Sequence, residues 1–135
     1  MNAVPKGYRY GEEFPREAFV QRAIKVYFTA QGFLIEKSGF IDLVCSHAEL
    51  GQRWIIEAKG QTSDVGLDFR TCLGQLLQAM NDPEGFYGIA VPDTSQYIFQ
   101  CKRVSQWVRT TLRLHWLLVK SDGSLRIITP DEPLE

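Results

Sequence analysis

The stretch Trp54-Ile55-Ile56-Glu57-Ala58-Lys59 is a short, mostly apolar run with two charged residues at its end, and the fold prediction starts from it. A short run of this composition is typical of a buried β-strand. Side chains alternate along a strand, so Glu57 and Lys59 share one face while Ile56 and Ala58 share the other. Two charges at the end of such a strand are costly to bury unless a partner compensates them. A divalent cation and an internal ion pair are both suitable partners.

Three polar residues on the neighbouring predicted elements are candidates for the same site. Asp42 lies in an apolar strand predicted over 40–46. Glu17 shares the apolar stripe of the first predicted helix, although an acid in a first helical turn is favourable for electrostatic reasons alone. Gln75 lies on a helix predicted over 67–80, where a local hydrogen bond would also explain a polar amide. Their order on consecutive elements, rather than any one of them, indicates a shared site.

The surrounding pattern alternates between helical and strand periodicity. We expect a helix that begins near 14–15 and ends at Gly32, strands over 33–37, 40–46, 53–59 and 86–91, the helix over 67–80, a helix around 104–112 and a hairpin of 114–119 with 125–128. The helical crossover makes the strands at 53–59 and 86–91 parallel, whereas the short links favour antiparallel pairs. The prediction is one α/β domain over 1–135, with a mixed central sheet flanked by helices: an αβββαβ core, then a helix and a hairpin.

Composition bounds the class of protein. A chain of 135 residues with 44% hydrophobic and 23% charged residues is globular and of single-domain size. No apolar run reaches the roughly 18 residues that span a bilayer, and residues 1–10 contain no apolar segment typical of a secretory signal. Cys45, Cys72 and Cys101 are isolated in apolar contexts, which argues against a disulfide framework or zinc site. We therefore expect a reducing compartment, the cytoplasm, and no membrane association.

Charge is distributed unevenly although the net charge is only −1. Residues 96–128 contain six basic residues and a single acid. Lys102, Arg103 and Arg109 in this segment are the candidates for contacts with a nucleic acid backbone. An ordinary solvated surface is the competing interpretation.

The set of polar residues resembles the PD-(D/E)xK nuclease superfamily, whose restriction-endonuclease-like fold is shared with archaeal Holliday-junction resolvases. The resemblance covers residues 17–91 and rests on Glu17, Ile41-Asp42, Glu57-Ala58-Lys59 and Gln75. It implies that Asp42 and Glu57 bind magnesium and that Lys59 serves the attacking water. It also implies that the helix residues Glu17 and Gln75 support the metal site. A glutamate in this role is typical of some branches of the superfamily, and a glutamine is typical of others. Ile41 stands where the name-giving proline would be, a substitution common in the superfamily.

These expectations combine into a metal-dependent endonuclease that hydrolyses double-stranded or branched DNA. Mg²⁺, or Mn²⁺ in its place, prefers hard oxygen ligands, and the Ala58 carbonyl can add a third oxygen to the two carboxylates. Cleavage of two strands or of a junction needs two protomers, so a homodimer fits this hypothesis. The alternative is a non-catalytic nucleic-acid-binding or protein-interaction module that retains the fold, and the third is an unrelated α/β domain with a structural ion pair. A module would bind DNA equally well in the presence of a chelator.

Overall fold

A computed structural model describes residues 11–135, so the expectation about residues 1–10 lies outside the described part. The strands are β1 (Leu34–Glu36), β2 (Leu43–His47), β3 (Gln52–Ala58), β4 (Phe86–Pro92), β5 (Leu114–Val119) and β6 (Leu125–Ile128). The helices are α1 (Glu17–Ala30), α2 (Val65–Gln78), α3 (Ser95–Lys102) and α4 (Gln106–Leu112). All six strands form one sheet in the order β1-β2-β3-β4-β5-β6. Strands β3, β4 and β5 are parallel to one another and the outer pairs are antiparallel, which confirms the predicted mixed sheet.

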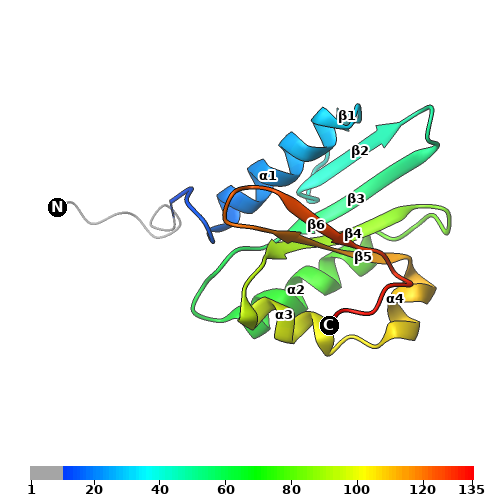
Figure 1. Ribbon diagram of the computed structural model, residues 1–135. Coiled ribbons are helices and arrows are strands. Elements are labelled where there is room, and N and C mark those ends of the chain that lie inside the picture. Colours follow the sequence, from blue (N-terminus) through cyan, green and yellow to red (C-terminus); the bar gives the residue numbers. More distant parts are fainter. Residues whose placement is uncertain (1–10) are drawn as a thin grey trace.

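Helices cover the sheet on both faces, with α1 on one side and α2 and α3 on the other (Figure 1). The alternation along β3 divides its side chains between two cores. Ile56 and Ala58 pack in the core that contains Val20 and Ile24 of α1. Ile55 packs in the other core, which contains residues of α2 and α3. Because Glu57 lies two residues from Ile55, its side chain faces α2.

The pairing of β2 with β3 places Asp42 beside Glu57. Leu43, the first residue of β2, pairs antiparallel with Ile56. Extending this register by one residue puts Asp42 opposite Glu57, and opposite residues in an antiparallel pair project from the same face. The strand predicted over 40–46 in fact begins at Leu43, so Asp42 lies at its entrance rather than inside it.

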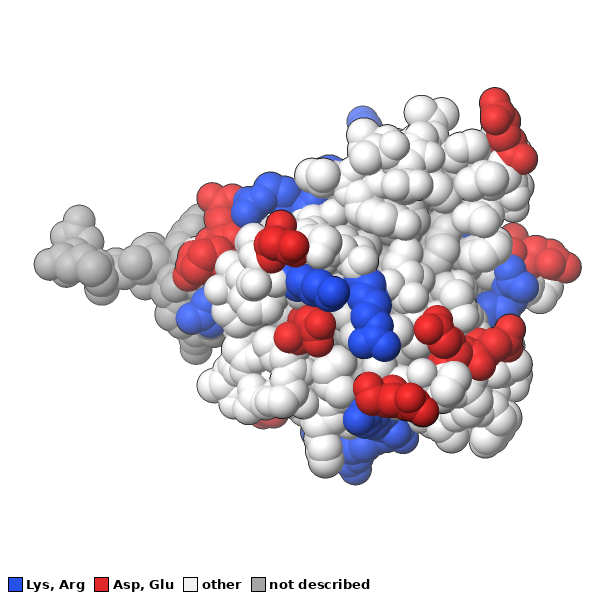
Figure 2. Space-filling view, in the orientation of Figure 1, with Lys and Arg blue, Asp and Glu red and all other residues white. Residues whose placement is uncertain are grey.

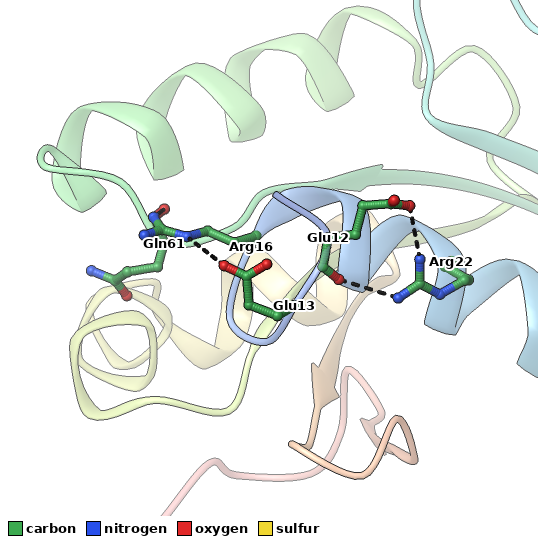
Figure 3. Close-up of polar contacts among 5 residues, drawn as sticks. All are labelled: Glu12, Glu13, Arg16, Arg22 and Gln61. Atoms are coloured by element: carbon green, nitrogen blue, oxygen red, sulfur yellow. Dashed lines mark hydrogen bonds and ion pairs between the residues drawn. The ribbon is translucent and has the colours of Figure 1, made fainter. Parts of the chain in front are cut away.

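The loop after β3 is held tightly against the start of α1. A Cβ atom at Gly60 would overlap the backbone of Glu17, so only glycine allows this approach. The Gln61 N–H donates to the Pro15 carbonyl over 2.8 Å, and the Arg16 guanidinium donates to the Gln61 carbonyl over 3.1 Å. Arg16 also pairs with Glu13 in the same cluster (Figure 3). These contacts fix the position of Glu17 relative to the end of β3.

The structure contains one helix, α3, that the sequence did not predict. The expected helix at 104–112 corresponds to α4, whereas α3 was not predicted. Only Tyr97 and Cys101 of α3 are buried, which is too narrow an apolar stripe to stand out in the sequence. Within residues 11–135, none of the helices combines the length and the apolar character needed to cross a bilayer.

Candidate functional site

The Asp42 side chain continues the hydrogen bonding of β3 beyond the point where its pairing with β2 stops. Its Oδ2 accepts a hydrogen bond from the Ala58 N–H over 2.8 Å. The N–H and C=O of one strand residue point to the same side, so the Ala58 carbonyl is also directed toward the β2 side. The Lys59 N–H points the other way and donates to Ala90 of β4 over 3.0 Å. Two carboxylates and one main-chain carbonyl therefore meet where β2 begins and β3 ends.

Glu57 is a buried acid with an unused oxygen. Its residue exposure is 2%, and its Oε1 has no hydrogen-bond partner among the described residues. Burial, followed by the nearby Asp42 carboxylate, raises the pKa of Glu57 to about 7, whereas Lys59 opposes the rise. Glu57 also contributes to the raised pKa of the Cys72 thiol on α2, although burial of Cys72 is the main cause. An unpartnered buried carboxyl oxygen beside a second acid is an environment that a cation would stabilise.

Lys59 acts on this site as a nearby charge. Its ammonium lowers the pKa of Glu57 and of Glu17 against the effect of burial. Lys59 is half-buried and forms no ion pair with any residue in the range 11–135. Its N–H donors thus remain available to a water molecule or a phosphate oxygen.

Glu17 joins the site through a residue that the sequence analysis missed. The Gln21 amide donates to Asp42 Oδ1 over 2.9 Å and to Glu17 Oε2 over 3.3 Å. Burial raises the pKa of Glu17, Lys59 lowers it, and Asp42 and Asp68 raise it further. Gln21 lies one helical turn after Glu17, so the i, i+4 spacing was the signal available in the sequence.

Asp68 on α2 is a further acid near the site. The Thr62 hydroxyl donates a hydrogen bond to its carboxylate, and its charge raises the pKa of Glu17. No group of three or more Asp, Glu, His or Cys side chains in the described part of the chain has the geometry of a metal cage. A cation at this place would have two side-chain ligands, Asp42 and Glu57, and would need main-chain or water oxygens besides.

Gln75 lies on the α2 side of the Asp42 turn. Its side chain is exposed, and it has no hydrogen bond to Glu57 or Lys59 among the described residues. Instead it lines a hollow of about 580 Å³. The hollow, called the Phe40 hollow below, is lined by Gly39, Phe40, Ile41, Gln75, Gln78 and Ala79.

The basic residues singled out in the sequence separate into two groups. Lys102 and Arg103 are exposed at the end of α3, but Arg109 is only 3% exposed. The Arg109 guanidinium donates to the carbonyls of Thr129 (2.7 Å) and Glu132 (2.9 Å). The prediction that Arg109 contacts DNA is therefore wrong, because the folded chain uses its guanidinium internally.

No strongly basic surface replaces the predicted one on the face drawn in Figure 2, where acidic and basic side chains alternate. Two cations lie close to Asp42 instead. Arg22 and Lys25 of α1 line a second hollow, called the α1 hollow below, together with two acids. The hollow is lined by Glu12, Ala18, Gln21, Arg22, Lys25, Asp42 and Leu43. Arg22 also pairs with Glu12 over 3.2 Å (Figure 3). Lys25 is exposed and forms no ion pair within residues 11–135.

Comparison with known proteins identifies the fold. No protein family profile matches the chain, and no curated protein matches it either. Among solved structures it is similar to an XisH family protein from Nostoc punctiforme, with a TM-score of 0.57 and 17% identity over 79% of this chain and 95% of the other. It is also similar to an fdxN element excision controlling factor protein from Anabaena variabilis, with a TM-score of 0.55 and 17% identity over 81% and 96%. These neighbours are consistent with the predicted fold class.

Proposed function

We propose that this chain is a metal-dependent endonuclease of the PD-(D/E)xK type that hydrolyses phosphodiester bonds of DNA. The observation that carries the proposal is that the Asp42 and Glu57 carboxylates lie together at the end of β3, where the Ala58 N–H binds Asp42 and where Lys59 follows. A structural ion pair would explain the buried acids only if Lys59 bonded to one of them. It bonds to neither in the described part of the chain.

The residues fit a divalent cation in the chemistry of their donors. Asp42 and Glu57 provide hard carboxylate oxygens, one of which, Oε1 of Glu57, is buried without a partner. The ion would lower the pKa of a bound water and offset negative charge on the phosphate. A positive charge there would also counter the burial that holds the Glu57 pKa near 7. The magnesium ligands would thus be Asp42, Glu57 and the main chain of Ala58.

The protein's own contribution is to hold the reacting groups in place. The Ala58 N–H and the Gln21 amide each bond to a different oxygen of Asp42, which fixes the orientation of its carboxylate. Lys59 would orient the attacking water and stabilise the charge that develops on the phosphate oxygens. Glu17 restrains Gln21 through its own hydrogen bond, so it acts as a positioning residue.

The hollow beside Asp42 suggests the path of the DNA backbone. Arg22 and Lys25 line the α1 hollow with Asp42, so a phosphate chain that reaches the metal ligands would pass these two cations. Lys102 and Arg103 are further candidates for contacts with the same DNA backbone. They lie at the far end of α3, however, because α3 and α4 carry the chain from the end of β4 back to the start of β5 (Figure 1). The backbone contacts nearest the scissile phosphate are therefore assigned to α1.

The alternative function is a DNA-binding module without catalysis. One structural neighbour is described as an fdxN element excision controlling factor, a description that fits a cleaving chain and a non-cleaving chain equally. A module does not need a buried acid with an unpartnered oxygen, because leaving such a group uncompensated costs stability. This observation favours the enzyme.

The test is incubation of the purified chain with supercoiled, linear, single-stranded and branched DNA in Mg²⁺, Mn²⁺ or EDTA. Cleavage that needs the metal, and that is lost in Glu57→Gln and kept in the exposed-loop control Glu49→Gln, supports the enzyme. DNA binding that is equal in Mg²⁺ and EDTA, with no cleavage of any substrate, supports the module instead. Gel filtration with light scattering in the same buffers tests the predicted homodimer.

A further inference from the structure

Phe40 is displayed at the tip of a closed turn beside the catalytic carboxylates. Its side chain is 98% exposed, the largest value among the exposed large hydrophobic residues that the structure describes. The Ser38 hydroxyl donates to the Ile41 carbonyl over 2.6 Å and closes the turn that carries Gly39 and Phe40. Asp42 follows immediately. The Phe40 ring therefore takes no part in the core, and its face is free to stack against a planar ligand.

The Phe40 hollow has the chemistry of a nucleobase site rather than a phosphate site. No charged side chain lines it. Phe40, Ile41 and Ala79 provide an aromatic ring and aliphatic groups, and the amides of Gln75 and Gln78 provide hydrogen-bond donors and acceptors. A flat heteroaromatic ring with polar edges needs this combination. A phosphate would need cations, which are found on the other side of Asp42.

We propose that the Phe40 hollow receives an unpaired nucleobase of the DNA substrate, stacked on Phe40 and met at its edge by Gln75 and Gln78. This inference rests on the proposed function, because it takes the scissile phosphate to lie at Asp42. Asp42 lines the α1 hollow, and the preceding residue, Ile41, lines the Phe40 hollow. The charged hollow receives the backbone, and the uncharged hollow receives the base attached to it.

The inference defines the substrate class. A base in a matched duplex must be unpaired and unstacked before it can enter the hollow, which costs free energy. A base in a single strand, a mismatch, a bubble or a branch point is already unpaired. The chain should therefore bind DNA with unpaired bases more tightly than matched duplex of the same length and sequence.

The experiment measures affinity by fluorescence anisotropy in Ca²⁺, which can occupy oxygen sites while usually supporting little turnover. The probes are a single strand, a matched duplex and the same duplex with a three-base bubble. Phe40→Leu removes the ring and keeps an apolar side chain, while Phe40→Tyr keeps the ring. Trp107→Leu is the matched control, because Trp107 is an exposed aromatic residue on α4.

The expected result is a loss of about 5- to 100-fold in affinity for the single strand and the bubble with Phe40→Leu. The affinity for the matched duplex should change much less, so the variant's preference for unpaired DNA becomes smaller. Phe40→Tyr should restore the preference, and Trp107→Leu should leave every affinity unchanged. Each variant is also assayed for cleavage in Mg²⁺, which reports the nuclease activity independently of the preference.

The contrary outcomes separate the two proposals. If the wild-type chain cleaves DNA but Phe40→Leu leaves the preference unaltered, the base site is wrong and the nuclease stands. If Phe40→Leu changes only self-association in sedimentation experiments, the hollow is an interface between copies of the chain and the base site is again wrong. A wild-type chain that neither binds nor cleaves any of these DNAs overturns both.

Discussion

The Asp42 carboxylate accepts a hydrogen bond from the Ala58 main-chain N–H across 2.8 Å, at the point where the ladder between β2 and β3 stops. A side-chain oxygen thus replaces the carbonyl that a continued strand would have supplied. The consequence is that Asp42 is tied to the strand that carries Glu57 and Lys59. The proposed metal site is built on the sheet itself, which holds its ligands more rigidly than separate loops would.

Glu57→Gln should stabilise the metal-free protein at pH 8. Since the folded-state pKa is raised to about 7, the stability that protonated Glu57 contributes is full below pH 4.5 and is lost as pH rises through about 7. Glutamine cannot ionise, so the variant should be more stable at pH 8 by about 3 kcal/mol and show no such gain at pH 4.5. Urea unfolding at both pH values measures this. An equal stability difference at the two pH values would refute the raised pKa, and Glu49→Gln is the exposed control.

Gln21→Leu should weaken metal binding without removing a ligand. The amide orients Asp42 and restrains Glu17, and loss of such an orienting hydrogen bond typically costs about 10- to 100-fold in metal affinity or activity. Isothermal titration with Mn²⁺ measures the effect. Gln31→Leu, at the exposed end of α1, should have normal affinity. An unchanged Mn²⁺ affinity in Gln21→Leu would show that the hydrogen bond has no role in the site.

Lys59→Met should separate metal binding from cleavage. The ammonium lies near the acids without bonding to them, so its removal leaves both carboxylates in place. We expect cleavage to fall by about 10²- to 10³-fold, as for loss of a charge-stabilising donor. Mn²⁺ binding at pH 8 should persist. Lys120→Met on the β5–β6 hairpin is the control, and retained cleavage in Lys59→Met would remove this lysine from the mechanism.

The two groups of cations should differ in their effect on the salt dependence of DNA binding. Each lost phosphate contact lowers the slope of log affinity against log salt by about 0.9. The Arg22→Gln, Lys25→Gln pair should therefore flatten the slope by up to about 2, since both residues line the α1 hollow. The same changes at Lys102 and Arg103 provide the comparison. If only the second pair changed the slope, the backbone would cross the end of α3 instead of α1.

Arg109→Lys should destabilise the fold and leave DNA affinity unchanged. The guanidinium joins the carbonyls of Thr129 and Glu132, and a single ammonium cannot reproduce this fork. The expected loss is about 1 to 3 kcal/mol in the free energy of unfolding, measured by urea titration. Weaker DNA binding with unchanged stability would return Arg109 to the DNA-contacting surface.

Local sequence patterns were sufficient for the centre of the site. The alternation along 54–59 and the short link to the preceding strand led to the prediction that Asp42 and Glu57 share a face. The observed register, with Leu43 paired to Ile56, places them so. These two features depend only on nearest neighbours in the sheet. The fold class follows from the same reasoning, because the crossover helix between β3 and β4 dictates parallel strands.

Contacts between distant segments could not be predicted in this way. The hydrogen bond from Gln21 to Asp42 depends on how the turn at 38–41 enters β2, which no periodicity encodes. Arg109 is buried because residues 129–132 of the C-terminal segment accept its hydrogen bonds, so its basic context in the sequence was misleading. Charge counts describe composition, whereas exposure depends on the tertiary fold.

The central claim is that Asp42 and Glu57 jointly hold one catalytic divalent ion. The most direct measurement is an anomalous difference map from crystals grown with Mn²⁺ at a concentration that supports cleavage. We predict a peak within about 2.3 Å of a carboxylate oxygen of each residue and of the Ala58 carbonyl oxygen, and no such peak in Glu57→Gln crystals. A map with no peak between these carboxylates, from protein that cleaves DNA under the same conditions, would contradict the account.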